Sequence, residues 1–395
     1  MSDLEIRDVP DSDVDQMIGL TDFVFHDRTK DEDERERAEW WFGRAERIGA
    51  YDGSRLVGMV AALPIPISVP GGDLPSANVT AVGVLPTHRR RGILSTLMDR
   101  CLADQVAAGR PVAALWASEA AIYGRYGFGS SAPRIRTEVR TVQPLRLRIE
   151  PDPRPLRLID PAGAEEILNP LYERSRRRRG GQLARDPEWW RRNQLREADD
   201  EDPKRTLPRI VVLDADPGGY ALYRADLSGK VHLAELVGDT PAVEAALWQF
   251  LASIDLTESL HCWSRPLDDT LLAASGDLDQ IKVTEQSSAL WFRLTDLPAA
   301  LAGRSWATET DLVLGVLDER IPANQGLWRL TGERTDTLAD LTLQSRDLAA
   351  AYLGGGTSIR TLVRTGLATE HTPQAAARLD AALATPYGPQ LTDHF

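Results

Sequence analysis

In residues 76–86, SANVTAVGVLP, apolar and polar side chains alternate, and this period of two predicts a β-strand. After the turn THRRRG the period changes, because the apolar residues between Ile93 and Leu102 recur at the spacing of one helix face. A second apolar run at 109–118 predicts another buried strand, and residues 119–129 predict a short helix or turn beyond it. The first segment is therefore predicted to be an α/β domain in which a turn joins a strand to an amphipathic helix.

The same succession of patterns recurs after a proline-rich stretch at 151–161, which we interpret as a linker. PEWWRRN at 187–193 resembles AEWWFGR at 38–44, and residues 231–251 repeat the strand, turn and helix. These echoes predict an internal duplication. In the second copy Gly238-Asp239-Thr240-Pro241 stands where the first has arginines, so this copy is expected to keep the fold and to have lost the site.

The remaining segment contains alternating runs separated by turns, followed by three helical stretches at 345–353, 358–366 and 373–384. This order predicts an α+β domain with its strands first. We expect three domains, with the boundaries 1–145, 146–284 and 285–395.

Length and charge narrow the class of protein. The 395 residues exceed one ordinary core, which agrees with several domains. The formal net charge of −13 disfavours nucleic acid as a partner and favours cationic small molecules or peptides. No apolar run is long enough to span a membrane, and the acidic N-terminal stretch lacks the pattern of a signal peptide, so a cytoplasmic protein is expected. Two cysteines and six scattered histidines predict no disulfide framework and no metal site.

The turn Arg89-Arg90-Arg91-Gly92 carries the main candidate chemistry. The first N–H groups of the following helix are unpaired and lie at the positive end of the helix dipole, where phosphate binds readily. Arginines add charge-assisted hydrogen bonds, and glycine lets the backbone approach a ligand closely. A solvated basic turn is the alternative, but the flanking strand and helix favour a phosphate site. The turn matches neither the Walker loop nor the Rossmann fingerprint.

Four other features have simpler interpretations. The arginine run at 174–179 lacks interleaved aromatic residues, so it indicates a solvated helix face or salt bridges rather than nucleic-acid binding. LGGGTS at 353–358 lacks the lysine of a phosphate loop and indicates a turn between helices. The acidic stretch at 30–39 is either a charged helix exterior or an attractor for a polyamine. The pairs Trp40-Trp41 and Trp189-Trp190 are interpreted as core or interface anchors.

VGVLPTHRRRGIL resembles the acetyl-CoA motif of the GNAT acyltransferases, although Leu94 replaces the usual small residue. Together with ASEAAIYGRYGFG and the three-part layout, it makes the chain similar to the enhanced intracellular survival (Eis) family of N-acetyltransferases. The resemblance implies tandem GNAT-type domains, the second degenerate, followed by an α+β domain of sterol-carrier-protein type. It also implies acetyl-CoA as co-substrate, amines of aminoglycosides or similar polyamines as acceptors, and a hexameric assembly.

The resemblance further implies the residues of the site. Tyr123 would be the general acid and the α-carboxylate of Phe395 the base. The backbone of Val82 to Val84 would contact the pantetheine arm and the thioester, and the arginine-glycine turn would surround the pyrophosphate. The implied cofactor-binding residues are Val82, Gly83, Val84, Arg89, Arg90, Arg91, Gly92, Ile93, Leu94, Ser95, Ser118 and Glu119.

Several alternatives stay open at this point. Tyr126 competes with Tyr123 as the donor to the departing thiolate. An acetyl-cysteine intermediate on Cys101 is disfavoured because that thiol lies on the apolar helix face. His88 is the nearest side-chain base, but it belongs to the phosphate turn. For the whole protein, a non-catalytic acyl-CoA or lipid carrier and a protein-lysine acetyltransferase are the competing functions.

Overall fold

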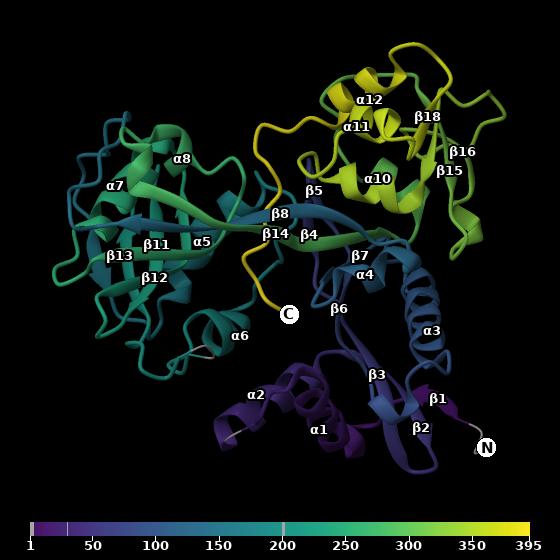
Figure 1. Cartoon of the computed structure of the whole chain (residues 1–395), viewed down its shortest axis with the longest axis horizontal. Helices are drawn as coiled ribbons and strands as arrows, with labels where there is room; N and C mark the ends of the chain where they lie inside the picture. The colour runs from purple at the N-terminus through teal and green to yellow at the C-terminus, as the bar shows by residue number, and fades with distance from the viewer. Residues whose placement is uncertain (1–3, 30, 200–201) are drawn as a thin grey trace. The chain divides into compact units, whose positions relative to one another are not determined.

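A computed structural model of the chain describes residues 4–29, 31–199 and 202–395 (Figure 1). The described residues do not include residues 1–3 of the acidic N-terminal stretch or Lys30 of the predicted acidic stretch. The chain forms two compact units. The first contains Met1–Ser131, Leu290–Ala384 and His394–Phe395, and the second contains Ala132–Ala289 and Thr385–Asp393.

The first unit contains a sheet with the strand order β1-β2-β3-β6-β7, completed by the last residues of β14 (Ile281–Leu294). All neighbouring strands of this sheet are antiparallel except β6 and β7, which run parallel. A small hairpin, β4 and β5, lies outside the sheet. The strands are β1 (Glu5–Asp8), β2 (Glu46–Asp52), β3 (Arg55–Leu63), β4 (Ile67–Val69), β5 (Gly72–Leu74), β6 (Ser76–Val84) and β7 (Val112–Trp116).

Helices cover both faces of this sheet (Figure 1). A Cβ on Gly83 would meet Val24 of α1, whereas a Cβ on Gly58 would meet Ile93 of α3. Gly83 pairs with Met59, the residue after Gly58, so α1 and α3 pack on opposite faces. The helices and turns are η1 (Asp11–Asp13), α1 (Val14–Phe25), α2 (Glu32–Gly43), η2 (Pro86–His88), α3 (Ile93–Ala107), α4 (Ala120–Tyr123) and η3 (Gly124–Tyr126).

The first unit also contains a four-stranded sheet near the end of the chain, with the order β16-β15-β17-β18. The prediction of strands followed by helices holds for three strands, but β18 lies between two helices. This strand has only three residues, too few for an alternating pattern to be visible. The elements are α9 (Leu297–Ala302), β15 (Val313–Leu317), η6 (Pro322–Asn324), β16 (Gly326–Arg329), β17 (Leu341–Gln344), α10 (Ser345–Tyr352), α11 (Ile359–Arg364), β18 (Ala368–Glu370) and α12 (Ala375–Leu383).

The second unit is built on a sheet with the order β8-β13-β12-β11-β10-β9, in which only β12 and β13 are parallel. Its element order repeats that of the first copy, as predicted from the repeated patterns in the sequence. The elements are β8 (Gly129–Arg140), β9 (Arg157–Ile159), α5 (Glu165–Arg176), α6 (Pro187–Trp189), η4 (Trp190–Gln194), β10 (Arg209–Leu213), β11 (Gly219–Ala225), β12 (Lys230–Gly238), α7 (Pro241–Ala252), β13 (Ser259–Arg265), α8 (Thr270–Ala274) and η5 (Leu278–Gln280).

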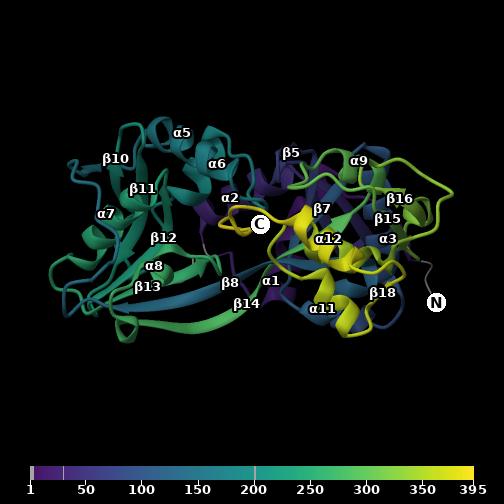
Figure 2. The same cartoon turned by 90° about the horizontal axis from the view of Figure 1, so that it is seen from above.

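The sheet of the second unit separates two hydrophobic cores. Val211 and Leu213 of β10 face the core under α7, whereas Ile210 and Val212 face the core under α5. This alternation is the period of two expected for a strand buried on both faces. Figure 2 shows α5 and α6 beside each other in this unit. Both tryptophans of PEWWRRN are fully buried, which confirms the interpretation of Trp189-Trp190 as core anchors.

Three local expectations require correction. The predicted linker at 151–161 contains the edge strand β9, which pairs with β10. The strand predicted at 76–86 ends at Val84, because Pro86 begins a 3₁₀ turn and has no N–H for the ladder. The stretch at 287–301, expected to open the third domain, contributes the end of β14, which pairs with β7. The predicted domain boundary after residue 284 falls inside this strand, and the domain boundaries stay predictions.

Candidate active site

The two parallel strands β6 and β7 separate partway along their length. Their pairing runs from Ser76–Val112 to Val79–Leu115, and β6 then continues to Val84. A register shift between β3 and β6 accompanies Ala81, whose φ of 49° lies in the left-handed region. The backbone of Val82, Gly83 and Val84 therefore lies beyond the pairing with β7, and we call this interruption of the pairing the opening beside Val82–Val84. These are the residues that the resemblance assigns to the pantetheine arm.

The arginine-glycine turn follows directly and leads into α3. Arg90 and Gly92 have φ values of 62° and 79°, so the backbone turns twice through the left-handed region before Ile93 begins the helix. A Cβ on Gly92 would meet no atom within 4 Å, so its conformation rather than crowding favours glycine. Within the described residues, no side chain caps the N-terminus of α3. Its first N–H groups are therefore available to an anion.

The side chains of this turn differ in what they contact. Arg89, Arg90 and Arg91 are exposed, and the Nε of Arg89 donates to the carbonyl oxygen of Val84 at 3.2 Å. His88 has contacts at both ring nitrogens: Nε2 lies 3.3 Å from a carboxylate oxygen of Asp52, and Nδ1 lies 2.8 Å from the Thr87 hydroxyl. His88 thus ties the turn to the β2–β3 hairpin, a structural task that weakens its candidacy as a base.

Tyr123 lies on the short helix α4, which follows β7 and the exposed residues Ser118 and Glu119. Its side chain is buried, and burial raises the pKa of Tyr123 to about 12, against the lowering effect of a hydrogen bond with Ser118. Its ring meets that of Phe128 edge-on, with 6.2 Å between the centres. A phenol with this pKa keeps its proton at neutral pH, so Tyr123 is a hydrogen-bond and proton donor.

Tyr126, the competing tyrosine, is held in a different way. Its hydroxyl lies 3.3 Å from the hydroxyl of Ser95 on α3. The guanidinium of Arg125 lies 5.4 Å from the centre of its ring. Tyr126 therefore links the tyrosine loop, residues 123–127, to the helix that begins at the arginine-glycine turn, while Tyr123 is linked to Ser118 at the end of β7.

Side chains from the C-terminal part of the first unit support the tyrosine loop. The Nε of Arg320 donates to the carbonyl oxygen of Arg125 at 3.3 Å, and its Nη1 lies 3.0 Å from both carboxylate oxygens of Asp99 on α3. Arg293, fully buried, pairs with Asp318 at 2.6 and 2.7 Å. Local sequence patterns do not reveal these residues, because their partners lie on other elements: Arg320 is 195 and 221 residues from Arg125 and Asp99, and Arg293 is 25 residues from Asp318.

A Cβ on Gly127 would lie only 2.6 Å from the Arg293 guanidinium carbon, and Gly127 has a φ of 83°. Glycine is therefore required here both by its conformation and by the close approach of Arg293. The tyrosine loop thus rests on a buried ion pair.

The last two residues of the sequence belong to the first unit. The His394 ring lies 5.4 Å from the ring of Trp116, the last residue of β7. Phe395 is only 7% exposed. Phe395, which carries the α-carboxylate, directly follows His394. The His394 ring packs at the end of β7, just before Ser118 and Glu119.

Exposed aromatic side chains lie on α1 beside the open part of β6, and the next helix, α2, is rich in acidic residues. Val24 of α1 packs on Gly83, and its neighbours Phe23 and Phe25 are 56% and 41% exposed. On α2, the rings of Trp40 and Trp41 are half-buried rather than core residues, with 6.0 Å between their centres. The same helix carries the acidic residues Glu32, Asp33, Glu34, Glu36 and Glu39.

Neither cysteine has the properties of a nucleophile. Cys101 and Cys262 are buried, and burial raises the pKa of each thiol to about 12. In residues 4–29, 31–199 and 202–395, no group of three or more histidine, cysteine or acidic side chains could hold a metal ion. Over the same residues, none of the helices has the length and apolar character needed to cross a bilayer.

In the second unit, the position equivalent to the arginine-glycine turn is filled by the chain itself. Asp239 pairs with Arg174 at 2.6 Å and accepts the N–H of Gly218 at 2.8 Å. The Thr240 side chain caps the N-terminus of α7 by accepting the N–H of Val243. A carboxylate and a hydroxyl thus stand where the first copy presents exposed arginines and an uncapped helix. This agrees with the predicted loss of the site.

The arginine run at 174–179 makes ion pairs within the second unit. Arg174, Arg176 and Arg179 contact Asp239, Glu173 and Asp268, respectively. These pairs agree with the interpretation of the run as salt-bridge partners.

Domain-family models match three parts of the chain. Two models described as acetyltransferase (GNAT) domain match residues 5–131 and 181–294, and a sterol carrier protein domain model matches residues 297–392. These matches confirm the expected architecture of two GNAT-type domains followed by a domain of sterol-carrier-protein type.

Similar proteins occur in Streptomyces and Mycobacterium species. A Streptomyces avermitilis protein named uncharacterized N-acetyltransferase is 37% identical, covering 88% of this chain and 89% of its own. The N-acetyltransferase Eis of Mycobacterium tuberculosis is 33% identical, covering 86% of each chain. The crystal structure of Eis1 from Mycobacterium abscessus superimposes with a TM-score of 0.86 over 100% of both chains at 29% identity.

Proposed function

Because the chain belongs to the Eis family of GNAT N-acetyltransferases, we propose that it transfers acetyl from acetyl-CoA directly to amino groups of aminoglycosides or similar polyamines. The observation that carries this proposal is the opening beside Val82–Val84, which leads into an uncapped helix N-terminus. An anion at that helix and an acyl group at that strand edge would be bound by groups that the fold leaves available.

The first GNAT domain suits acetyl-CoA as its substrate. Arg89 to Ser95 would surround the pyrophosphate, with Ile93 buried beneath and Leu94 half-buried. The backbone of Val82 to Val84 would hold the pantetheine arm, and Ser118 with Glu119 would face it from the end of β7. The exposed arginines and the first N–H groups of α3 support this assignment, since both attract phosphate.

In the transfer step, the amine nitrogen forms a bond to the acetyl carbon, and the bond from that carbon to sulfur then breaks. The amine must lose a proton, which the Phe395 α-carboxylate would accept. The departing thiolate must gain a proton, which the Tyr123 phenol would donate. A backbone N–H beside the opening of β6 would stabilise the negative oxygen formed between the two events. Tyr123 has its proton available before the step, since burial raises the pKa of the phenol to about 12.

The class of acceptor is inferred from the charge of amines and of the protein surface. Amine acceptors are cations in water, with a reference pKa of about 10.4 for a lysine-like amine. The carboxylates of α2, which outnumber its two arginines, and the exposed rings of Phe23 and Phe25 support a cationic acceptor, through Coulomb attraction and cation–π contact. Aminoglycosides and polyamines carry several such amines, so they would use more of this surface than a single lysine would.

The test is release of free thiol from acetyl-CoA in the presence of a panel of aminoglycosides, polyamines and lysine peptides. We expect turnover with the multiply charged amines and weak turnover with lysine peptides. Bound acetyl-CoA without turnover on any amine would contradict the proposal and favour an acyl-CoA-binding carrier. Preferred turnover on lysine peptides would favour a protein-lysine acetyltransferase.

The role of Phe395 has a separate test in a protein extended by two glycines after this residue. The extension moves the α-carboxylate without removing any side chain, so acetyl transfer should fall while acetyl-CoA binding persists. Normal transfer by the extended protein would return the search for a base to His88 or Glu119.

We further propose a cytoplasmic homo-oligomer, a hexamer by resemblance to the Eis family. The use of acetyl-CoA, a metabolite made inside cells, supports this compartment. Light scattering should give six times the chain mass of 43.6 kDa. A mass of one chain would contradict the assembly, and recovery from the secreted fraction would contradict the location.

A further inference from the structure

Residues 385–393 run through the second unit and are held along their length. Arg179 donates to the carbonyl oxygen of Gly388 at 2.8 Å. Farther along, the Ser264 hydroxyl donates to the carbonyl oxygen of Leu391 at 3.1 Å. These contacts use backbone atoms of the segment, so they fix its path. We call residues 385–395 the tail.

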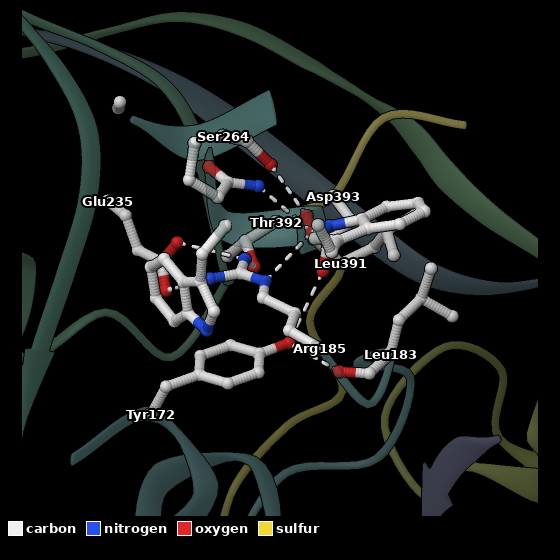
Figure 3. Close-up of polar contacts among 12 residues, drawn as sticks. Tyr172, Leu183, Arg185, Glu235, Ser264, Leu391, Thr392 and Asp393 are labelled. Atoms are coloured by element: carbon white, nitrogen blue, oxygen red, sulfur yellow. Dashed lines mark hydrogen bonds and ion pairs between the residues drawn. The ribbon is translucent and has the colours of Figure 1, made fainter. Parts of the chain in front are cut away.

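The tail is held most tightly at Asp393, whose side chain is completely buried. One of its carboxylate oxygens accepts three hydrogen bonds at 2.9 Å, from Arg185 Nε, Trp189 Nε1 and Gln194 Nε2. The other oxygen lies 3.2 Å from the Tyr172 hydroxyl. Figure 3 shows this side chain meeting Arg185 and Tyr172 inside the unit. A buried carboxylate is stable only with such partners, so the cluster is a built receptor for one acidic residue.

The receptor does not depend on the tail for its own charge balance. Arg185 lies between two carboxylates, because Glu235 of β12 approaches its Nη2 to 2.9 Å on the side away from Asp393 (Figure 3). The guanidinium also lies 3.8 Å from the centre of the Tyr172 ring and 4.6 Å from that of Trp190. If Asp393 leaves, Arg185 is still paired with Glu235 and still packed between aromatic rings. Undocking the tail is therefore compatible with a folded second unit.

The receptor occupies a particular place in the second GNAT domain. The parallel pairing of β12 with β13 covers Lys230–Leu233, and β12 then continues to Gly238 without β13. Glu235, which pairs with Arg185, lies on β12 beyond the paired region. Ser264, which binds the tail, lies on β13 beyond the paired region. This is the counterpart of the opening beside Val82–Val84 in the first copy. In the second copy, the tail contacts Ser264 directly and reaches Glu235 through Arg185.

We propose that the second GNAT domain is a docking site for the chain's own tail and that the Arg185–Asp393 pair positions the α-carboxylate of Phe395 for catalysis. This inference rests on the proposed function, in which that carboxylate is the base. Two residues extend at most about 7 Å, so anchoring Asp393 restricts the carboxylate to a small volume. A free tail would have to lose its conformational entropy in every catalytic cycle. Arg185 and Asp393 are thus positioning residues that act through Phe395.

The test is Asp393→Ala in the full-length protein. A carboxylate displaced by about 1 Å or more lowers the rate substantially, so kcat should fall roughly tenfold to a hundredfold. The dissociation constant of acetyl-CoA should not change, because the mutated residue belongs to the second unit. Hydrogen exchange should accelerate in residues 385–395 and not in β12 or α5. The conservative variant Asp393→Asn, which keeps the size and acceptor oxygen, should have an intermediate kcat.

Asp226→Ala is the matched control. Asp226 is a carboxylate of the second unit with an ionic partner, His232 at 2.8 Å, but it lies on the turn between β11 and β12. This variant should keep kcat and the exchange rates of the tail. It separates the loss of a local ion pair from release of the tail.

Two outcomes would overturn the inference. Unchanged exchange in the tail of Asp393→Ala would show that the pair does not hold it, and unchanged kcat with a mobile tail would show that docking does not serve catalysis. A lower melting temperature alone is the signature of a merely structural role, so kcat is measured well below the transition.

The protein extended by two glycines separates the two proposals. If it transfers normally, the base assignment fails. If it is inactive while Asp393→Ala is fully active, only the positioning role fails.

Discussion

The guanidinium of Arg320 lies 5.3 Å from the centre of the Tyr126 ring, and the same side chain binds Asp99 of α3 and the backbone of Arg125. An arginine of the sterol-carrier-type domain thus joins the tyrosine loop to the helix that begins at the arginine-glycine turn. Arg320 and the Tyr126–Ser95 contact together hold the two parts of the proposed site, the thiol-protonating loop and the phosphate-binding helix, in their relative placement. The C-terminal domain is therefore a structural support of the first GNAT domain.

Replacing Arg320 by alanine should lower kcat about tenfold, because the loop that carries Tyr123 loses one of its two connections to α3 and keeps only the Tyr126–Ser95 contact. Steady-state kinetics at saturating amine and acetyl-CoA measures this effect. Arg378→Ala is the control, since Arg378 makes an ion pair with Asp311 within the C-terminal domain and touches no part of the tyrosine loop. Equal kcat in the two variants would show that Arg320 does not position the loop.

Gly127→Ala should destabilise the protein more than Gly53→Ala. Both glycines have left-handed backbones, which cost roughly 1–2 kcal/mol for a residue with a Cβ. Only at Gly127 would the new Cβ also collide with Arg293, whereas a Cβ at Gly53 would meet no atom within 4 Å. Thermal unfolding of the two variants measures the difference. Equal melting temperatures would mean that Arg293 moves aside without cost.

Tyr123→Phe should lower kcat by roughly 10²–10⁴, the usual contribution of a positioned acid or base. The affinity for acetyl-CoA should survive, since only one hydroxyl is lost. Burial raises the pKa of Tyr123 to about 12, so the phenol stays protonated as the pH rises to about 10. The wild-type pH–rate profile should therefore show no decrease below that pH that is due to deprotonation of Tyr123.

The control for this substitution is Tyr126→Phe, which removes the hydroxyl that lies 3.3 Å from Ser95. Its effect on kcat should be smaller, because this hydroxyl contacts α3 and not Ser118. A larger effect of Tyr126→Phe would assign the acid to the other tyrosine.

Local patterns predicted much of the first GNAT domain. The alternation at 76–86 and the helical spacing from Ile93 specified β6, the turn and α3, because each depends on neighbours in sequence. The left-handed conformation of Arg90 was not predictable, since arginine has no preference for it.

The supports of the site were not predictable either. Asp393 is one acidic residue in LTDHF, and nothing in that stretch indicates that it meets Arg185, 208 residues earlier. Arg320 and Arg293 are likewise defined by contacts with distant elements. Trp40 and Trp41 are half-buried, whereas Trp189 and Trp190 are fully buried, although both pairs follow a glutamate in the shared sequence Glu-Trp-Trp. Tertiary packing therefore sets this difference.

The cysteines provide a test of direct transfer. A thiol with a pKa of about 12 is almost entirely protonated at neutral pH, so neither Cys101 nor Cys262 should become acetylated during turnover. The double variant Cys101→Ala and Cys262→Ala should retain kcat within a few-fold. Mass spectrometry of wild-type protein quenched during turnover checks the same point. An acetyl group on Cys101 would establish a covalent intermediate.

Replacing both Arg89 and Arg90 by alanine should weaken acetyl-CoA binding about tenfold or more. Each lost charge-assisted bond to the pyrophosphate contributes roughly 1.5–3 kcal/mol, but both side chains are exposed and screening by salt reduces this. Calorimetric titration at two salt concentrations should show a smaller difference at high salt. The matched control removes Arg174 and Arg178, which flank Asp239 beside the equivalent turn of the second copy, and should leave the affinity unchanged. Unaltered affinity in the Arg89 and Arg90 variant, or an equal loss in the control, would remove the phosphate site from this turn.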